Sequence, residues 1–284
     1  MQWNVGNVEI FQIIELEAGK IIQSIIPDAT PENVKKMKWL IPDYADKNGI
    51  LKAFQSFLIK SQGKYILVDT CNGNDKNRPN IPEWGNLKIK FVEKLNEFGI
   101  TPLDIDCVVC THLHFDHVGW NTILVNGKWK PTFPNAKYIF SKKEYEYWSS
   151  KPKKEMIDDL LGFEDSVHPI IEAGLSELVE EDFQFDENVG LISTPGHTPH
   201  HVSVKIQSLG KKGLISVDFI YHPCQVEKTE WGNTVDTYSD QALETRKKTL
   251  SSIANTNTLL LGSHFSNPVG GYVITKNGKL IIKP

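Results

Sequence analysis

Three histidines and an aspartate cluster near the middle of the chain, at His112, His114, Asp116 and His117. They directly follow Cys107–Thr111, an apolar run that predicts a buried strand. As the chain leaves this strand, alternating imidazoles lie on one side of it. Zinc, iron, manganese and cobalt all accept imidazole and carboxylate ligands. The segment therefore predicts a metal site at the end of a strand.

Three further ligand candidates each come just after a short apolar run: His197, Asp218 and His264. Two metal ions about 3.5–4 Å apart need more ligands than the first segment supplies, and these residues are of suitable types. Gly196 and Gly262 lie close before two of them and allow tight backbone turns beside a metal. Ligands at four strand ends could converge on one point.

These seven residues resemble, in order and approximate spacing, the full ligand set of the metallo-β-lactamase superfamily. Asp69 resembles the family's first motif, an aspartate that orients the site from behind the sheet, where it would hydrogen-bond a ligand imidazole. The resemblance covers nearly the whole chain. It implies an αββα sandwich, in which two mixed sheets pack face to face with helices outside and the site lies at one edge.

The resemblance also implies a role for each ligand around two divalent metal ions, with Zn²⁺ favoured and iron, manganese or cobalt as alternatives. The implied ligands are His112, His114 and His197 for the first ion, Asp116, His117 and His264 for the second, and Asp218 for both. A hydroxide held between the ions would be the nucleophile, since water bound at such a centre can have a pKa near 7.

Two branches of the superfamily resemble this chain most. N-acyl-homoserine lactonases share a tyrosine three residues after the bridging aspartate, which here is Tyr221 after Asp218. The methyl-parathion-hydrolase-like group shares the long segment between the first ligand cluster and His197, and a stretch at residues 242–248. Members of both branches are small esterase-like or lactonase-like hydrolases, so the reaction class does not depend on the choice.

We therefore expect a small-molecule carbonyl ester as substrate, most of all a lactone. Tyr221 would stabilise the developing oxyanion, and Asp116 would return a proton to the leaving alkoxide. Two alternatives stay open. One is hydrolysis of an organophosphate or phosphodiester at the same centre, and the other is a metal-binding sensor without turnover.

Several residues near the ligands allow a functional and a structural interpretation. We expect His201 to support the site from a second layer or the core, and Trp120 and Phe265 to line an apolar pocket because they adjoin ligands. His222 is expected to have a structural role, and His168 to lie in an exposed loop. Cys107 and Cys110 form a C-x-x-C pair, but side chains three apart on a strand point to opposite faces, so we expect buried free thiols.

Composition excludes several classes of partner. The net charge is -4 and the apolar fraction 40%, and no Lys/Arg-dense block indicates a nucleic-acid partner. Residues 151–154, which hold three lysines, read as a solvated loop. No apolar stretch approaches the roughly 18 residues of a membrane span, and the N-terminus lacks a signal-peptide pattern. These observations favour a cytoplasmic protein, and the resemblance implies a homodimer.

Periodicity predicts short strands and helices that would carry these residues in a mixed α/β fold. We expect one domain over residues 1–284 with a helical insertion at about 141–178. The predicted strands next to ligands are Cys107–Thr111, Val189–Ser193, Gly213–Val217 and Leu259–Leu261. The predicted helices are Leu87–Phe98, Lys142–Ser150, Lys153–Leu161, Asp165–Leu175 and Ser239–Ala254.

Overall fold

The computed structural model describes residues 1–17, 24–151 and 155–284. Their internal contacts group them into two compact units. Unit 1 comprises residues 1–4, 8–15 and 55–186, and unit 2 comprises residues 5–7, 16–54 and 187–284. Among the described residues, no helix is both long and apolar enough to cross a membrane. The single-domain assignment stays a prediction.

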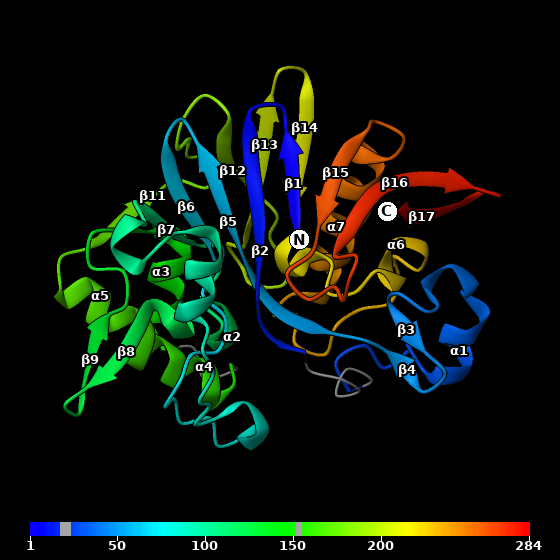
Figure 1. The fold of residues 1–284 in the computed structure, drawn as a ribbon. Coiled ribbons are helices and arrows are strands. Elements are labelled where there is room, and N and C mark those ends of the chain that lie inside the picture. The colour runs from blue at the N-terminus through cyan, green and yellow to red at the C-terminus, as the bar shows by residue number, and fades with distance from the viewer. Residues whose placement is uncertain (18–23, 152–154) are drawn as a thin grey trace. The chain divides into compact units, whose positions relative to one another are not determined.

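Unit 1 is built on a seven-stranded mixed sheet with the order β1-β2-β5-β6-β7-β10-β11 (Figure 1). Its strands are β1 (Gln2–Val5), β2 (Val8–Glu17), β5 (Ala53–Ser61), β6 (Lys64–Val68), β7 (Cys107–Cys110), β10 (Lys137–Ser141) and β11 (Ser176–Val179). β5 and β6 form an antiparallel hairpin, whereas β6, β7, β10 and β11 run parallel. A separate hairpin joins β8 (Thr122–Val125) to β9 (Lys128–Pro131).

The parallel pairing of β6 and β7 brings two chain segments to the same edge of the sheet. Val68 at the end of β6 is opposite Val109 in β7, so the residues that follow each strand are neighbours. The Asp69 backbone N–H donates to the Val109 carbonyl at 2.8 Å. The first metal-site segment therefore begins directly beside Asp69.

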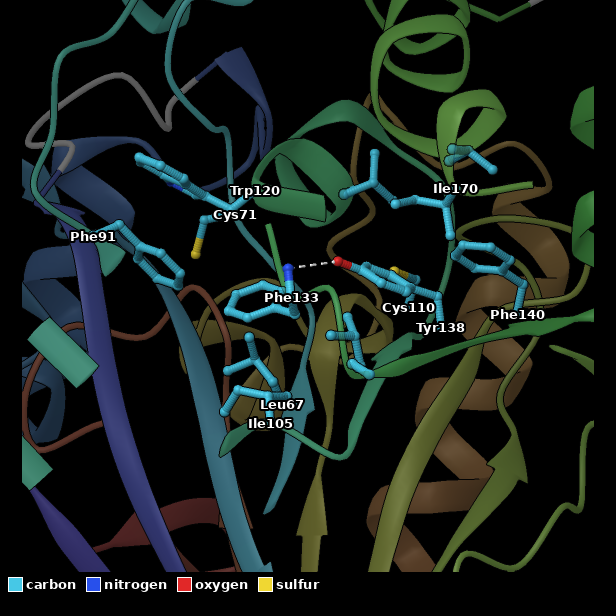
Figure 2. Packing of buried hydrophobic residues seen from close by; sticks show 14 of the residues in the cluster. Leu67, Cys71, Phe91, Ile105, Cys110, Trp120, Phe133, Tyr138, Phe140 and Ile170 are labelled. Atoms are coloured by element: carbon cyan, nitrogen blue, oxygen red, sulfur yellow. Dashed lines mark hydrogen bonds between the residues drawn. The ribbon is translucent and has the colours of Figure 1, made fainter. Parts of the chain in front are cut away.

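Buried hydrophobic side chains form the core of unit 1 (Figure 2). Leu67, Phe133, Tyr138 and Phe140 are fully buried, and each such side chain contributes about 1.5–3 kcal/mol. The backbone N–H of Phe133 donates to the Tyr138 hydroxyl at 3.1 Å, which satisfies the polar end of a buried ring. The strands on either side of β7, which are β6 and β10, therefore have side chains anchored in this core.

The helices of unit 1 are short. They are α2 (Phe115–Val118), α3 (Lys142–Ser149), α4 (Ile157–Gly162), the π-helix η7 (Phe163–Val167) and α5 (His168–Glu172), with 3₁₀ turns η3 (Pro82–Trp84), η4 (Val92–Phe98), η5 (Pro102–Asp104) and η6 (Gly119–Asn121). Helical turns run from α3 to α5 and β11 begins at Ser176, and the helical insertion expected at about 141–178 stays a prediction. Residues 152–154 of the predicted lysine loop, and so the start of the helix predicted from Lys153, lie outside the described residues.

The helix predicted over Leu87–Phe98 is wrong in its first part, because the helical turns begin only at Val92. Leu87 instead forms a bridge with Asn74, whose side chain also accepts from the Ile89 backbone N–H at 2.7 Å. Those contacts hold the segment extended. The helical turns end at Gly99, whose φ of 71° lies in the left-handed region that glycine favours.

Unit 2 contains a six-stranded sheet with the order β12-β13-β14-β15-β16-β17. The strands are β12 (Val189–Ser193), β13 (Val202–Ser208), β14 (Lys211–Ile215), β15 (Thr258–Leu261), β16 (Gly270–Lys276) and β17 (Lys279–Lys283). β14 and β15 are parallel and the other neighbours antiparallel. With two mixed sheets in the chain, the predicted mixed α/β class is confirmed.

The parallel pair β14–β15 again places two candidate ligands at one edge. Ile215 is opposite Leu261, and Asp218 and His264 each follow three residues later. The predicted strand over Gly213–Val217 is wrong at its end, since β14 stops at Ile215. Val217 takes φ 51° and begins the 3₁₀ turn η8 (Val217–Phe219), which turns the chain at Asp218.

The remaining elements of unit 2 surround this sheet. They are the hairpin of β3 (Ala45–Asp46) and β4 (Gly49–Ile50), the helices α1 (Pro31–Lys36), α6 (Cys224–Glu227) and α7 (Ser239–Ile253), and the 3₁₀ turn η2 (Lys38–Leu40). α7 matches the predicted helix over Ser239–Ala254 within one residue. It contacts η8 and therefore lies next to Asp218.

Candidate metal centre

Asp69 fixes the geometry of the first ligand segment in unit 1. Its Oδ1 accepts from the Thr111 backbone N–H at 2.8 Å, and its Oδ2 lies 2.8 Å from His117 Nδ1. Because Nδ1 of His117 must carry the hydrogen of this bond, Nε2 retains its lone pair. A carboxylate behind a histidine is the usual way in which proteins orient a metal-binding imidazole.

The four candidate ligands of this segment lie together. The ring centroids of His112 and His114 are 4.7 Å apart, and those of His112 and His117 are 4.1 Å apart. Asp116 Oδ2 is 3.7 Å from His117 Nε2. All four residues are at most 9% exposed. The segment thus gathers three imidazoles and a carboxylate into one buried cluster.

Two buried carboxylates from the helical segment hold the backbone of this cluster. Glu144 Oε1 accepts from the Leu113 backbone N–H at 3.3 Å, and Asp159 Oδ1 accepts from that of Phe115 at 3.1 Å. Glu144 also accepts from Trp148 Nε1 at 2.7 Å, and this indole packs edge-on against His114 at 5.5 Å. Sequence reasoning missed both carboxylates, because acidic residues in short helices normally face solvent.

In unit 2, the Asp218 carboxylate lies between two imidazoles. Its Oδ2 is 3.3 Å from His197 Nε2, and its Oδ1 is 3.2 Å from His264 Nε2. All three side chains are at most 2% exposed. Each oxygen of the Asp218 carboxylate therefore faces a different imidazole nitrogen.

His201 supports Asp218 from behind. Its Nε2 accepts from the Asp218 backbone N–H at 3.2 Å, and its Nδ1 lies 2.9 Å from Thr194 Oγ1. The ring is fully buried. His201 is thus tied to the backbone of Asp218, and the supporting role expected of it stays a prediction.

Asp236 is a functional candidate that sequence reasoning missed. Its Oδ1 lies 2.9 Å from His197 Nδ1, its Oδ2 lies 3.6 Å from Arg246 Nη2, and its side chain is 1% exposed. Burial lowers the pKa of His197, but the adjoining Asp218 and Asp236 carboxylates raise it further, to about 9. The pair makes His197 strongly basic, and a basic imidazole binds a metal ion more tightly.

Arg246 is held beneath this pair by backbone oxygens. It donates to the carbonyls of Phe219, Thr229 and Trp231 at 3.0–3.2 Å. Its side chain is only 1% exposed, and a buried cation needs such partners. Arg246 therefore serves as a fixed positive charge behind Asp236.

His264 is anchored through Nδ1, as are His117 and His197. Its Nδ1 lies 3.1 Å from the Ala53 carbonyl, an acceptor only, so Nδ1 donates and Nε2 keeps its lone pair. In all three histidines Nδ1 is thus anchored to an oxygen, an arrangement typical of imidazoles that bind a metal ion through Nε2. This set of imidazoles and carboxylates fits divalent zinc, iron, manganese or cobalt.

Tyr221 lies against the His264 ring, with centroids 4.5 Å apart and planes at 38°. Its backbone N–H donates to Gln225 Oε1 at 2.8 Å, and its hydroxyl contacts the Lys52 ammonium. Tyr221 and Lys52 are 3% and 2% exposed. The structure therefore places Tyr221 beside a candidate ligand, together with a buried lysine that no sequence pattern indicates.

Both aromatics predicted to line a pocket pack in the interior. Trp120 stacks on Phe91 with centroids 5.4 Å apart and donates from Nε1 to Glu15 Oε1 at 2.6 Å. Phe265 is fully buried and packs edge-on against Tyr44 at 6.2 Å. Both side chains therefore contribute to interior packing. The expectation that they line a pocket stays a prediction.

Two other histidines take structural positions. His222 is fully buried, and its Nε2 lies 2.8 Å from the Tyr44 carbonyl while its Nδ1 accepts from the Cys224 backbone N–H. Burial lowers the pKa of His222 to about 3, so it is neutral at physiological pH. His168 was expected in a loop, but it begins α5 with its side chain half exposed, 3.6 Å from Glu164.

All four cysteines are free thiols, which confirms that prediction for Cys107 and Cys110. Cys110 is buried on β7 beside Asn121, whereas Cys107 is only partly buried, which corrects the prediction for that residue. Burial raises the pKa of both thiols, which makes them poor ligands and poor nucleophiles. The C-x-x-C pair plays no part in the ligand clusters found among the described residues.

Comparison with known proteins connects these clusters to one family. Residues 55–264 match the model of the metallo-beta-lactamase superfamily, well over half of the chain. The chain is 31% identical over 136 residues to an N-acyl homoserine lactonase from Bacillus sp, covering 46% of this chain and 45% of the relative. It is 26% identical over 183 residues to N-acyl homoserine lactonase AttM from Rhizobium radiobacter, covering 58% and 64%. The chain thus spans about half the length of the curated relatives it matches.

Solved structures share the fold over the whole chain. Hydrolase AbOPH, described as in the beta lactamase superfamily, matches with a TM-score of 0.81 and 22% identity, covering 100% of this chain and 96% of that one. AidC, described as a dizinc quorum-quenching lactonase, matches with a TM-score of 0.79 at the same identity and coverage. With the family model matched across every candidate ligand from His112 to His264, the chain belongs to the metallo-β-lactamase superfamily.

Proposed function

We propose that this protein is a dinuclear metal-dependent hydrolase of small carbonyl esters, with lactones as its substrate class. The observation that carries the proposal is the Asp218 carboxylate, whose two oxygens face His197 Nε2 and His264 Nε2 at 3.3 and 3.2 Å. A buried carboxylate placed in this way is suited to bridging two cations. The named activity of the lactonase relatives supports the choice of substrate.

The proposed centre follows the ligand roles that the resemblance to the superfamily implies. Its ligands are His112, His114 and His197 for one ion, Asp116, His117 and His264 for the other, and Asp218 for both. Two bound divalent cations would supply an activated water and polarise the substrate carbonyl. The imidazole and carboxylate donors favour Zn²⁺, with iron, manganese and cobalt as alternatives.

The remaining steps belong to side chains of this chain. Tyr221 would donate its phenolic hydrogen to the oxygen of the substrate carbonyl as negative charge develops there. Asp116 would take a proton at Oδ2 and pass it to the leaving alkoxide, so that ring opening yields a hydroxy acid. Asp69 and Asp236 would hold the imidazoles of His117 and His197 in their metal-binding tautomer throughout.

Metal analysis and a substrate panel test this proposal together. Wild-type protein loaded with Zn²⁺ is expected to hold two ions per chain and to hydrolyse lactones with a higher kcat/KM than aryl esters or organophosphates. Asp218→Asn is expected to lose at least one ion and most of the activity. Asp240→Asn, an exposed carboxylate on α7, is the matched control and should change neither.

Three results would contradict the proposal in different ways. If Asp218→Asn keeps both ions and full turnover, the bridging role is wrong. If organophosphates give the highest kcat/KM, the same centre has another substrate class. If the protein holds two ions and turns over no member of the panel, a metal-binding sensor replaces the hydrolase.

A further inference from the structure

Lys52 is a buried cation close to the ligands of unit 2. The residue precedes β5, forms a bridge with Phe265 and is 2% exposed. Its ammonium contacts the Tyr221 hydroxyl and lies 3.9 Å from the centre of the Tyr221 ring and 4.2 Å from that of Phe54. Burying an ammonium costs free energy unless such partners compensate. The Tyr221 hydroxyl and the two aromatic rings are therefore partners that stabilise the buried Lys52 ammonium.

The chemistry of the contact fixes its direction. An ammonium has three hydrogens to donate and no lone pair, so the Tyr221 oxygen must be the acceptor. The phenol's own hydrogen must therefore point away from Lys52. A hydroxyl that accepts from a cation also becomes a stronger donor, because successive hydrogen bonds polarise one another.

The same short segment holds both Lys52 and a candidate metal ligand. The Ala53 backbone N–H donates to the His264 carbonyl at 3.3 Å, and the Ala53 carbonyl lies 3.1 Å from His264 Nδ1. The Tyr221 ring packs on the His264 imidazole. Lys52, Tyr221 and His264 therefore form one connected arrangement, in which the phenol oxygen has a defined position beside the imidazole.

We propose that Lys52 is a positioning residue for Tyr221: its ammonium holds the phenol oxygen, so that the phenolic hydrogen is presented to the developing oxyanion of the substrate. This inference rests on the proposed function for the identity of the acceptor. It assigns to the chain a cation that acts through Tyr221, separate from the metal ligands.

A double-mutant cycle on the metal-loaded protein tests the inference. Tyr221→Phe is expected to lower kcat on the order of a hundredfold, as does loss of one oxyanion donor. Lys52→Met should lower kcat by a similar factor with little change in KM, and should add nothing in the Tyr221→Phe background. Lys52→Arg, which keeps a cationic donor, should restore most of the activity. Lys47→Met, at an exposed lysine, is the matched control.

A spectroscopic measurement makes the test independent of turnover. In protein labelled with ¹³C at the tyrosine ζ-carbon, Lys52→Met should shift the Tyr221 resonance at fixed pH, and Lys47→Met should not. If this resonance does not move, or if Lys52→Met lowers kcat equally in both backgrounds, the inference is overturned. If wild-type protein hydrolyses nothing, the proposed function fails, and the resonance still decides whether Lys52 holds the phenol.

Discussion

Asp236→Asn is the sharpest perturbation of the metal centre, because it removes a charge while keeping a side chain of the same shape. The amide oxygen can still accept from His197 Nδ1, which lies 2.9 Å from Oδ1 in the native protein. The imidazole nevertheless loses one of the two carboxylates, Asp218 and Asp236, that raise its pKa. Loss of such a partner typically weakens metal binding about 10–100-fold. Because the hydrogen bond persists in Asp236→Asn, we expect the affinity for metal to fall about tenfold, or roughly 1.4 kcal/mol.

The pH of the assay decides whether this loss is visible. Burial lowers the pKa of His197, and its two carboxylate neighbours raise it to about 9, so a proton competes with the metal below that pH. Wild-type affinity should therefore rise with pH and level off near pH 9. In Asp236→Asn the levelling point should move to lower pH. Affinities should be compared at about pH 9.5, where proton competition has ended.

Competition against a chelator of known affinity measures both quantities, with Asp240→Asn as the control for an exposed carboxylate. Asp236→Ala extends the series, because it also takes the carboxylate from the buried Arg246, and removing one member of a buried pair costs about 3–5 kcal/mol of stability. Because Arg246 keeps its hydrogen bonds to backbone carbonyls, we expect a loss of stability near the lower end of this range. The reasoning is refuted if Asp236→Asn binds metal as tightly as Asp240→Asn at pH 9.5 with an unchanged pH profile.

Two further predictions concern stability, measured by urea unfolding in the presence of chelator. Gly196→Ala should lower the free energy of unfolding by about 2 kcal/mol or more, because Gly196 has φ 129° and an added Cβ would lie 2.2 Å from a backbone nitrogen at the start of α7. Gly232 has open space around it, so Gly232→Ala should leave the free energy of unfolding nearly unchanged. Equal effects of the two substitutions would contradict this account. His222 has its pKa lowered to about 3 by burial, so its contribution is present above pH 6.5 and is lost as the pH falls toward 3. At pH 4.5 the protonation of His222 in the unfolded state should lower the free energy of unfolding by about 3 kcal/mol. His222→Gln should lack this loss of stability in acid. If the variant loses stability in acid as the wild-type protein does, the prediction is contradicted.

The sequence alone determined which side chains could bind metal. Histidine and aspartate are chemically distinct from the apolar runs before them, and the strands were located correctly because buried strands are themselves apolar runs: β12 matches its predicted bounds and β7 and β15 match within one residue. The expected strand at Gly213–Val217 failed at its end, where β14 stops at Ile215 and Val217 turns with positive φ. A local pattern cannot reveal that turn, because valine otherwise favours strands.

The tertiary structure alone decided what holds those side chains. Asp236 is separated from His197 by 39 residues, and Lys52 from Tyr221 by 169, and neither lies in a pattern that indicates a partner. Their contacts arise where strand ends and loops cross in space. Ligand type is a property of one residue and can be seen in the sequence. The tautomer, basicity and direction of each group depend on a neighbour that only the folded chain provides.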